Sequence, residues 1–218
     1  MAVGRPRAFD MNKALDAAME VFWRKGYEGA SMVDLTTAMG INSPSLYAAF
    51  GSKKGLFEAV LDHYDRDRAG FLTDVLAQPT ARQAAEHYLR GLVDQATDPD
   101  GPRGCLLVQG GLTCGDDAAD IPARLAAHRH ATELTLRERF VCAKSEGDLP
   151  KGSDPAGLAR YLLTVANGMS IQASSGATGK ELRQVAEMAL LALPSSEKPA
   201  GDKKAAPRKK PRAEARAN

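Results

Sequence analysis

Apolar residues in the first part of the chain recur with the spacing of amphipathic helices. Five of them fall at i, i+3, i+4, i+7 and i+8, on one helical face: Leu15, Ala18, Met19, Phe22 and Trp23. Asp10 is placed to cap this helix, and Gly26 predicts its end. The pattern therefore predicts a first helix that packs through one face.

A second, shorter helix is predicted directly after it. Ser31 and Asp34 form an S-x-x-D capping box, in which each side chain satisfies a free backbone N–H of the first turn. Gly40 predicts the end of this helix after about two turns.

Two further helices follow in the stretch "MGINSPSLYAAFGSKKGLF". Asn42 or Ser43 is the candidate cap of the third helix, and Pro44 is compatible with its first turn, where the missing N–H costs nothing. Gly51 predicts its end, and Ser52 predicts the cap of a fourth amphipathic helix.

The second and third helices are joined only by the tight turn "GINS". A glycine-containing turn between two short helices is typical of the helix-turn-helix, whose second helix lies in the DNA major groove. Many helical corners of this kind bind nothing, so the spacing alone leaves a purely structural corner as the alternative.

Lys53 and Lys54 are unexpected at the start of the fourth helix, because the free N–H groups there favour negative charge. A DNA phosphate bound by these N–H groups and by a lysine explains them; two solvated surface lysines are the alternative. Tyr47 lies about 100° around the third helix from Leu46, so its hydroxyl is a candidate phosphate donor, with a half-buried packing tyrosine as the alternative.

These elements together resemble the DNA-binding segment of the TetR family of bacterial transcriptional regulators. The similarity covers about residues 9–64, including "VFWRKGYEGAS", the "MGI" turn, "LYAAF" and "GSKKGLF". It implies an all-α homodimer with a three-helix headpiece at 1–52, a helical effector-binding and dimerisation domain at 53–193, and no enzymatic activity. It also implies a palindromic double-stranded operator as partner and a small organic effector, whose binding commonly releases the DNA.

The resemblance also assigns contacts by position. It places Asn42, Ser43, Pro44 and Ser45 at the bases and Ser31, Thr36, Tyr47 and Lys53 at the phosphates, and Arg5 and Arg7 at a neighbouring groove or phosphate. The base-facing "NSPS" has no Arg, Lys or Gln for bidentate base contacts. Discrimination is therefore expected to rest on Asn42, on apolar contact with thymine methyl groups and on DNA shape.

The second half of the chain shows helical periodicity near 80–96, 104–115, 121–146, 154–174 and 179–193. By the same resemblance, the last two helices would pair with their copies across a two-fold axis. The candidate seam is apolar: Leu158, Leu162, Val165, Ala166, Met169, Leu182, Val185, Ala186, Ala189 and Leu190. The alternative is that these residues form an intramolecular core.

The expected effector cavity lies among the helices between about Phe57 and Met169. Cys105, Gln109 and Leu112 share one face of the helix predicted at 104–115, and neighbouring helices add three more candidates: Tyr88, His128 and Leu134. Cys105 follows "GPRG" at the opening turn of that helix, which makes a thiol-based redox or electrophile sensor an alternative function. A buried, unreactive cysteine is the structural alternative.

Charge adds a basic C-terminal tail to this picture. The net charge is +2, but residues 194–218 carry eight Lys/Arg against three Asp/Glu, which leaves −3 on residues 1–193. The tail is expected to be disordered, with non-specific nucleic-acid contact and simple solvation both open. Loss of all DNA affinity on removal of the tail would favour an architectural DNA-binding protein instead.

Other function classes find little support. No apolar run reaches the length of a membrane span and no secretion signal is present, so a cytoplasmic protein without membrane contact is expected. His128 and His130 point about 200° apart on a helix and cannot share a metal ion. Neither a catalytic motif nor a phosphate-binding glycine loop is found, so no cofactor and no metal are expected.

Overall fold

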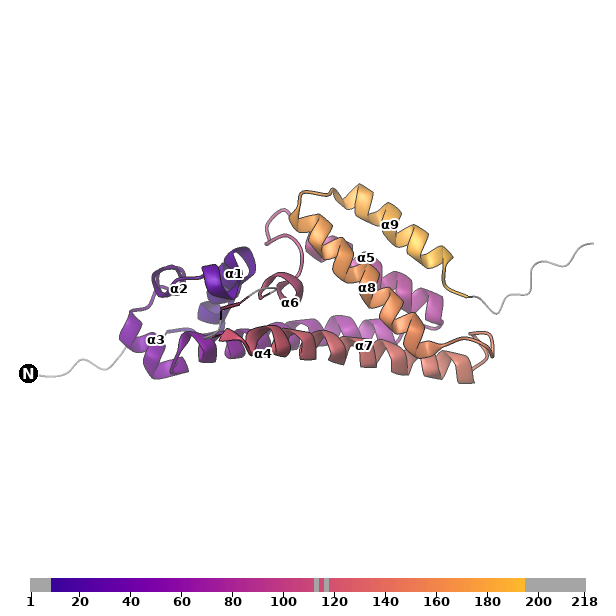
Figure 1. The fold of residues 1–218 in the computed structure, drawn as a ribbon, viewed down its shortest axis with the longest axis horizontal. Coiled ribbons are helices and arrows are strands. Elements are labelled where there is room, and N and C mark those ends of the chain that lie inside the picture. The colour runs from indigo at the N-terminus through magenta and orange to yellow at the C-terminus, as the bar shows by residue number, and fades with distance from the viewer. Residues whose placement is uncertain (1–8, 112–113, 116–117, 195–218) are drawn as a thin grey trace, which may run out of the picture.

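The computed structural model describes residues 9–111, 114–115 and 118–194, and within them every regular element is an α-helix (Figure 1). The predicted arm residues Arg5 and Arg7, and the basic tail beyond Pro194, lie outside the described residues. In chain order the helices are α1 (Met11–Gly29), α2 (Met32–Met39), α3 (Ser43–Phe50), α4 (Lys53–Leu76), α5 (Ala81–Ala96), α6 (Leu106–Gln109), α7 (Ile121–Ser145), α8 (Pro155–Ser174) and α9 (Gly179–Leu191). The predicted all-α fold is confirmed.

The predicted helix boundaries at the N-terminus are also confirmed. Asp10 accepts hydrogen bonds from the first turn of α1, and Ser52 accepts one from Gly55 N–H at the start of α4. The helical path of α1 is interrupted at Gly26, whose φ of 70° favours glycine. Its neighbour Tyr27 donates a backbone hydrogen bond of 2.7 Å to Gly110 O, so this kink is where α1 meets α6.

One hydrophobic core joins α1, α2 and α3 to the first half of α4, and it extends to α6 and the start of α7. At its centre the ring of Phe57 lies edge-on to two rings of α1, with centroid distances of 4.8 Å to Phe22 and 5.2 Å to Tyr27. Because Phe57 is contributed by α4, the three N-terminal helices complete their core only with α4 in place.

A second core lies among α5, α8, α9 and the C-terminal part of α7, with Val75 at the end of α4. Seven residues of the predicted dimer seam are buried inside this core of a single chain: Leu162, Ala166, Met169, Leu182, Ala186, Ala189 and Leu190. The prediction for these positions was therefore wrong, since an apolar helical face does not reveal whether its partner lies in the same chain or in another.

The helix predicted at 104–115 is much shorter in the structure. Of the residues described in this range, Leu106–Gln109 form the helix, and the carbonyl of Gly110 accepts the Tyr27 N–H of α1 instead of continuing it. A Cβ on Gly111 would lie 2.9 Å from Ile121, so the chain passes close to α7 at this point. The helix therefore ends just before Gly110 and Gly111, where the close packing leaves little room for a side chain, earlier than the apolar periodicity predicts.

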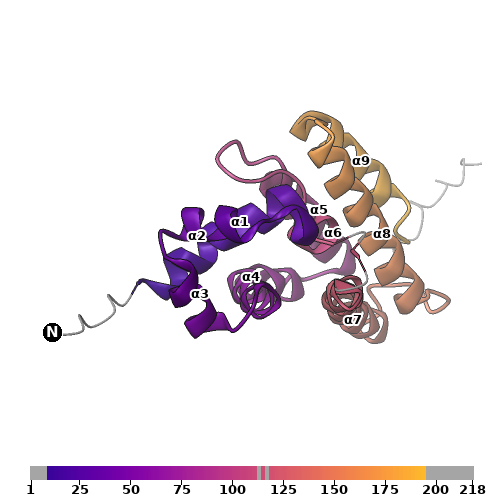
Figure 2. The same ribbon diagram turned by 60° about the vertical axis from the view of Figure 1, so that its left-hand side comes forward.

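Helix α7 runs beside α4 and is connected to it by three ion pairs along its first half (Figures 1 and 2). These pairs are Lys54–Asp120 at 2.7 Å, Glu58–Arg124 at 3.0 Å and Asp65–His128 at 2.5 Å. Their order shows that the two helices run in the same direction. All three pairs are partly exposed, so each contributes little stability, but together they fix the position of α7 along α4.

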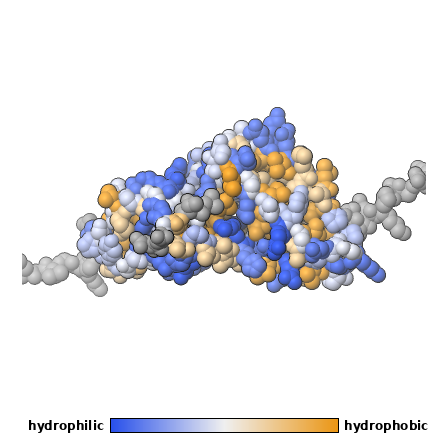
Figure 3. Space-filling model, viewed as in Figure 1, coloured by the Kyte–Doolittle hydropathy of each residue, from blue (hydrophilic) through white to orange (hydrophobic). Residues whose placement is uncertain are grey.

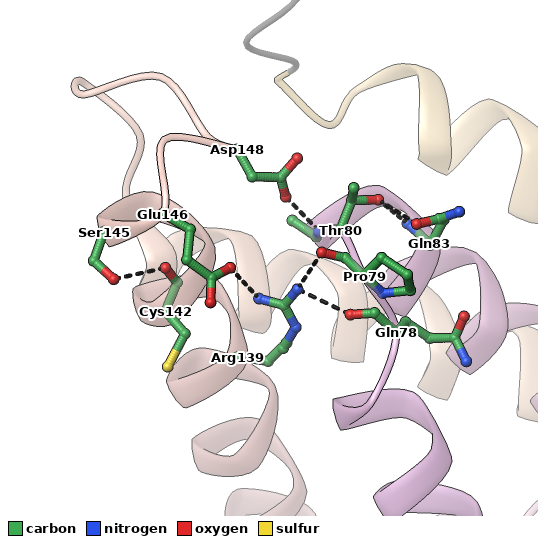
Figure 4. Close-up of polar contacts among 10 residues, drawn as sticks. Gln78, Pro79, Thr80, Gln83, Arg139, Cys142, Ser145, Glu146 and Asp148 are labelled. Carbon is green, nitrogen blue, oxygen red and sulfur yellow. Dashed lines mark hydrogen bonds and ion pairs between the residues drawn. The ribbon is translucent and has the colours of Figure 1, made fainter.

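The other end of α7 is held by the buried side chain of Arg139 (Figure 4). Its guanidinium donates to the carbonyls of Gln78 and Pro79 at 2.9 and 3.0 Å, in the loop between α4 and α5. It also lies 3.5 Å from the carboxylate of Glu146. Arg139 thus attaches the C-terminal end of α7 to the point where the chain turns from α4 into α5.

None of the helices in the described part of the chain has the length and apolar character needed to cross a membrane.

Candidate DNA-binding surface

Helices α2 and α3 form a helix-turn-helix whose turn depends on Gly40. This residue adopts the left-handed conformation (φ 64°), and its N–H bonds back to the carbonyls of Thr36 and Thr37. The Ser31–Asp34 capping box at the start of α2 is complete, and the turn ends at Asn42, which caps α3. The local sequence therefore determines both the ends of these helices and the turn between them.

Helix α3 buries Leu46 and exposes most of its polar and small side chains. Ser43, Pro44, Tyr47 and Ala48 are exposed, and Ser45 is half-buried. The side chain of Tyr47 is 51% exposed, and its hydroxyl has no hydrogen-bond partner among the described residues. Most of the contact residues predicted on α3 are therefore accessible to a binding partner.

Asn42 is less free than the sequence suggested. Its Oδ1 accepts the N–H of Ser45 at 2.8 Å and so caps α3. A bidentate contact to adenine requires both the oxygen and the nitrogen of an asparagine amide, so such a contact here would have to share the Oδ1 that already caps α3, while the Nδ2 donors have no such engagement.

Two of the predicted phosphate contacts already have intramolecular partners. The Ser31 hydroxyl donates to Asp34 at 2.8 Å, and the Thr36 hydroxyl donates to Met32 O at 2.9 Å. Each therefore has to exchange an existing bond for one to a phosphate, whereas the hydroxyl of Tyr47 does not.

The two lysines at the start of α4 also contact the protein itself. The Lys53 ammonium lies 4.6 Å from the centre of the Tyr27 ring and 3.4 Å from the carbonyl of Glu28, and burial lowers its pKa. Lys54 pairs with Asp120 of α7. Both lysines thus connect the start of α4 to neighbouring helices, a role that the sequence analysis did not predict.

Comparison with known proteins matches residues 14–60 to the model of bacterial regulatory proteins of the tetR family. The chain is 37% identical to the HTH-type transcriptional repressor ComR of Escherichia coli strain K12 over 88% of its own length and 92% of ComR. It is 32% identical to the repressor BdcR of the same organism, over 85% of the chain and 90% of BdcR.

This chain belongs to the TetR family. Among solved structures it is similar to a cysteine mutant of the TetR family transcriptional regulator CifR, complexed with 26bp double-strand operator DNA. The identity is 43% and the TM-score is 0.84, with 87% of this chain and all of the CifR chain covered. The predicted family is confirmed, and it is a family of transcriptional regulators rather than of enzymes.

Away from the helix-turn-helix, this TetR-family chain has a cavity of about 300 Å³ between α1, α4 and α5. Its walls include Trp23 of α1, Tyr64, Arg68 and Phe71 of α4, and Gly91 of α5. A signal for it was present in the sequence, because Arg68 interrupts the inward apolar stripe that Leu61, Tyr64, Phe71 and Val75 form along α4.

The residues predicted for the effector cavity are not brought together. Tyr88 is fully buried behind Phe71, and the Gln109 side chain folds back to accept the N–H of Cys105. His128 pairs with Asp65 at the surface of α7, and Leu134 is exposed on the same helix. Leu112 lies outside the described residues. The grouping of Cys105, Gln109 and Leu112 assumed a continuous helix at 104–115, which the described residues do not form.

Cys105 is close to this cavity but is shielded from it. Its side chain is 8% exposed, and its Sγ lies 3.4 Å from the hydroxyl of Tyr64, which lines the cavity. Arg103, two residues before Cys105 in the chain, does not face the thiol but donates to the carbonyls of Ala173 in the last turn of α8 and of Ala177 just after it. Cys105, Cys114 and Cys142 are all free thiols.

One group of side chains has the composition of a metal site. Asp16, His63 and Asp67 place ligand atoms within 4.8 Å of one another. His63 Nε2 lies 2.7 Å from Asp16 of α1 and 3.7 Å from Asp67 of α4. These contacts describe an ion pair that connects α1 to α4, and they require no metal ion.

The capping box at the start of α2 leads to a prediction about the pKa of Asp34. Hydrogen bonding from Lys25, followed by the hydroxyl and N–H of Ser31, lowers the pKa of Asp34 from 3.8 to about 2. A carboxylate whose pKa is lowered by folding contributes stability above its unfolded value, and this contribution is lost as the pH falls toward 2. In carboxyl-carbon NMR titrations we expect the pKa of Asp34 to rise in Lys25→Ala and, by less, in Ser31→Ala. An Asp34 midpoint near 4 in the natural chain would contradict this assignment.

Proposed function

We propose that this chain is a transcriptional repressor that binds a palindromic double-stranded operator as a homodimer and leaves it when a small organic effector binds. The observation that carries the proposal is the exposed face of α3, held in a complete helix-turn-helix. The similarity to CifR, whose structure contains operator DNA, supports placing α3 in the major groove.

Recognition by this surface relies on few direct base contacts. Ser43, Pro44 and Ala48 present small groups that suit thymine methyl groups and close approach of the helix, and Asn42 adds its Nδ2 donors. Tyr47 supplies a phosphate contact from the same helix. Ser31, Thr36 and Lys53 remain candidate phosphate contacts once their side chains turn outward, and Ser45 remains a candidate base contact. DNA shape supplies the remaining discrimination.

The dimer is proposed to form through the outward faces of α8 and α9. Hydrophobic residues gather over these two helices in Figure 3. Tyr161 and Ile171 of α8 are exposed, and on α9 Met188 and Leu191 are 71% and 78% exposed. Val185 lies on the same stripe of α9 and is the exposed member of the seam predicted from the sequence. Exposed apolar area of this kind is typical of subunit contacts.

The proposed switch acts through α4. The helix begins beside the DNA-binding surface at Lys53 and contributes Tyr64, Arg68 and Phe71 to the cavity wall. A shift of about 1–2 Å along this helix is enough to misplace α3, and a ligand drives it only by binding the two arrangements with different affinity. A coupling of about 1–3 kcal/mol changes DNA affinity roughly 5- to 150-fold.

A thiol-based switch at Cys105 is the second candidate function. It is favoured by one observation, the 3.4 Å contact between Cys105 Sγ and the Tyr64 hydroxyl, because an enlarged sulfur would push on the same stretch of α4. Burial of Cys105 and the engagement of Arg103 with α8 favour the ligand route instead.

Selection from a random double-stranded DNA pool with the full chain is expected to give a two-fold symmetric motif. Its half-sites should lie about 10–10.5 bp apart, or a multiple of this. Tyr47→Phe should weaken binding to all sequences by about 0.5–1.5 kcal/mol, because it removes a phosphate hydrogen bond. Thr73→Val is the control, because it removes an exposed hydroxyl from α4 outside both proposed contact surfaces, and it should bind as the natural chain does. Failure to select any motif would contradict the proposal, as would equal effects of the two variants.

Light scattering of the purified chain at micromolar concentration should give the mass of two chains. Met188→Lys places a charge in the proposed interface and is expected to shift the protein to monomers, since an unpaired charge in an apolar interface is costly. Val33→Lys changes an equally exposed apolar residue on α2 and should remain dimeric. A dimer that survives Met188→Lys would place the interface elsewhere.

Peroxide treatment separates the two switch routes. Because Cys105 is buried, we expect hydrogen peroxide to leave the DNA affinity of the natural chain and of Cys105→Ser unchanged within about twofold, as measured by fluorescence anisotropy. Release of DNA from the natural chain and from Cys142→Ser, but not from Cys105→Ser, would instead establish the thiol route.

A further inference from the structure

The cavity between α1, α4 and α5 contains a charged side chain among aromatic rings. Arg68 projects from α4 over the face of Tyr64, with its guanidinium carbon 5.2 Å from the ring centre. Trp23 lies edge-on to the same ring at a centroid distance of 5.3 Å, and Phe71 forms a further wall. An arginine is always charged in proteins, so the cavity has a permanent positive charge.

No carboxylate among the described residues lies within 4.0 Å of the Arg68 guanidinium nitrogens. The two acidic side chains nearest to it in sequence have other partners, since Asp65 pairs with His128 and Asp67 faces His63. Burial raises the pKa of Tyr64 well above 10 and that of Tyr88 to about 12, so both phenols are neutral at physiological pH. The charge of Arg68 is therefore compensated by the contact with the Tyr64 ring and, at longer range, by the carboxylate of Asp65.

Two buried donors at this cavity also have no acceptor within the described part of the chain. They are Nε of Arg68 and Nε1 of Trp23, and both residues line the cavity. Buried N–H groups in folded proteins are nearly always satisfied, so a pair of unpaired donors beside one cavity indicates a missing acceptor. Arg68 itself is half-buried, and a cation with no carboxylate of the described residues within 4.0 Å favours a negatively charged acceptor.

The remaining lining is mostly apolar and leaves room for more than an inorganic anion. Met19, Phe71 and the backbone of Gly91 line the rest of the roughly 300 Å³, and Gln95 of α5 and Asp67 of α4 are its other polar members. Glycine at position 91 leaves room for the Phe71 ring, because a Cβ there would lie 2.3 Å from it. The volume is at the lower end of that of small-molecule sites and suits one ring with a short substituent.

We infer that this cavity binds a small organic acid, an aryl or branched alkyl carboxylate, with its anionic group on Arg68 and Trp23 and its apolar body against Phe71 and Met19. Asp67, which also lines the cavity, lies 3.7 Å from His63 and forms no ion pair with Arg68 within 4.0 Å. A ligand in this position contacts α1 of the headpiece together with α4 and α5 of the C-terminal helical domain. The inference deepens the proposed function, because it names the chemical class of the effector.

Trp23 is the only tryptophan of the chain, so its fluorescence reports on this cavity alone. The full chain is titrated with six organic acids (benzoate, phenylacetate, 3-phenylpropionate, salicylate, 4-methylvalerate and cyclohexanecarboxylate) and with the amide of each, and calorimetry confirms each Kd. We expect at least one acid to change the Trp23 emission and to bind at least tenfold more tightly than its amide. If no acid binds better than its amide, the inference is overturned.

Variants at Arg68 test whether this side chain is responsible for the preference for the acid over the amide. Arg68→Gln should reduce the preference for the acid over the amide to within twofold, whereas Arg68→Lys, which keeps the charge, should retain part of it. Arg90→Gln is the matched control, because Arg90 is an exposed arginine on α5 that pairs with Glu86 outside this cavity. An acid preference that persists in Arg68→Gln would overturn the assignment of the anion to Arg68. Thermal unfolding by circular dichroism shows whether each variant is folded, and Arg68→Lys carries the test if Arg68→Gln is not.

DNA affinity is measured on the same samples, so that the two claims fail separately. Acid binding without any selected DNA motif would overturn the proposed function and leave the ligand assignment intact. Selective DNA binding without acid binding would overturn only the ligand assignment. When both hold, the acid that binds most tightly should lower operator affinity in the natural chain and in Arg90→Gln, but not in Arg68→Gln.

Discussion

The continuity of helix α4 is the constraint on which the rest of this structure depends. This helix of 24 residues contributes side chains to both hydrophobic cores. Phe57 and Tyr64 complete the core of the three N-terminal helices, while Phe71 and Val75 pack against the core of α5, α8 and α9. Because a helix of this length transmits displacement along its axis, the two halves of the molecule cannot move independently where they contact α4.

The short helix α6 provides the second connection between the two halves. Gly110, directly after it, accepts the N–H of Tyr27 in α1, and Leu107 accepts a hydrogen bond from Arg129 of α7. Just before it, Arg103 binds the last carbonyls of α8, the helix proposed to form part of the dimer interface. The headpiece is therefore attached to the C-terminal helical domain at two places, along α4 and at α6. A ligand between α1 and α4 lies between these attachments, where a small change in spacing alters the position of α3.

The N-terminal half could be predicted from the sequence because its structure is specified locally. Asp10, Ser31, Asn42 and Ser52 each cap the helix predicted for them, and Gly40 adopts the left-handed turn that its position demands. Such caps depend on residues within one helical turn, so their signals can be read directly from the chain.

Features that depend on distant contacts could not be predicted in this way. Helix α6 ends early because Gly110 bonds to α1, and Lys53 turns toward Tyr27 rather than outward. The apolar faces of α8 and α9 fill the core of their own chain, and the residues left for a partner are others, such as Met188. Arg68 was visible as a charge within an apolar stripe, yet its meaning depends on Trp23 of another helix.

The most direct test of this account is to map where α3 lies on DNA. An iron chelate attached at Ala48→Cys, in a chain whose three natural cysteines are replaced by serine, cleaves the DNA that is closest to that residue. The account predicts two cleavage windows on the selected operator, related by two-fold symmetry and separated by about one helical turn or a multiple of it. Cleavage spread evenly along the DNA would contradict the account, as would a single window or windows produced only by a chelate placed on α9.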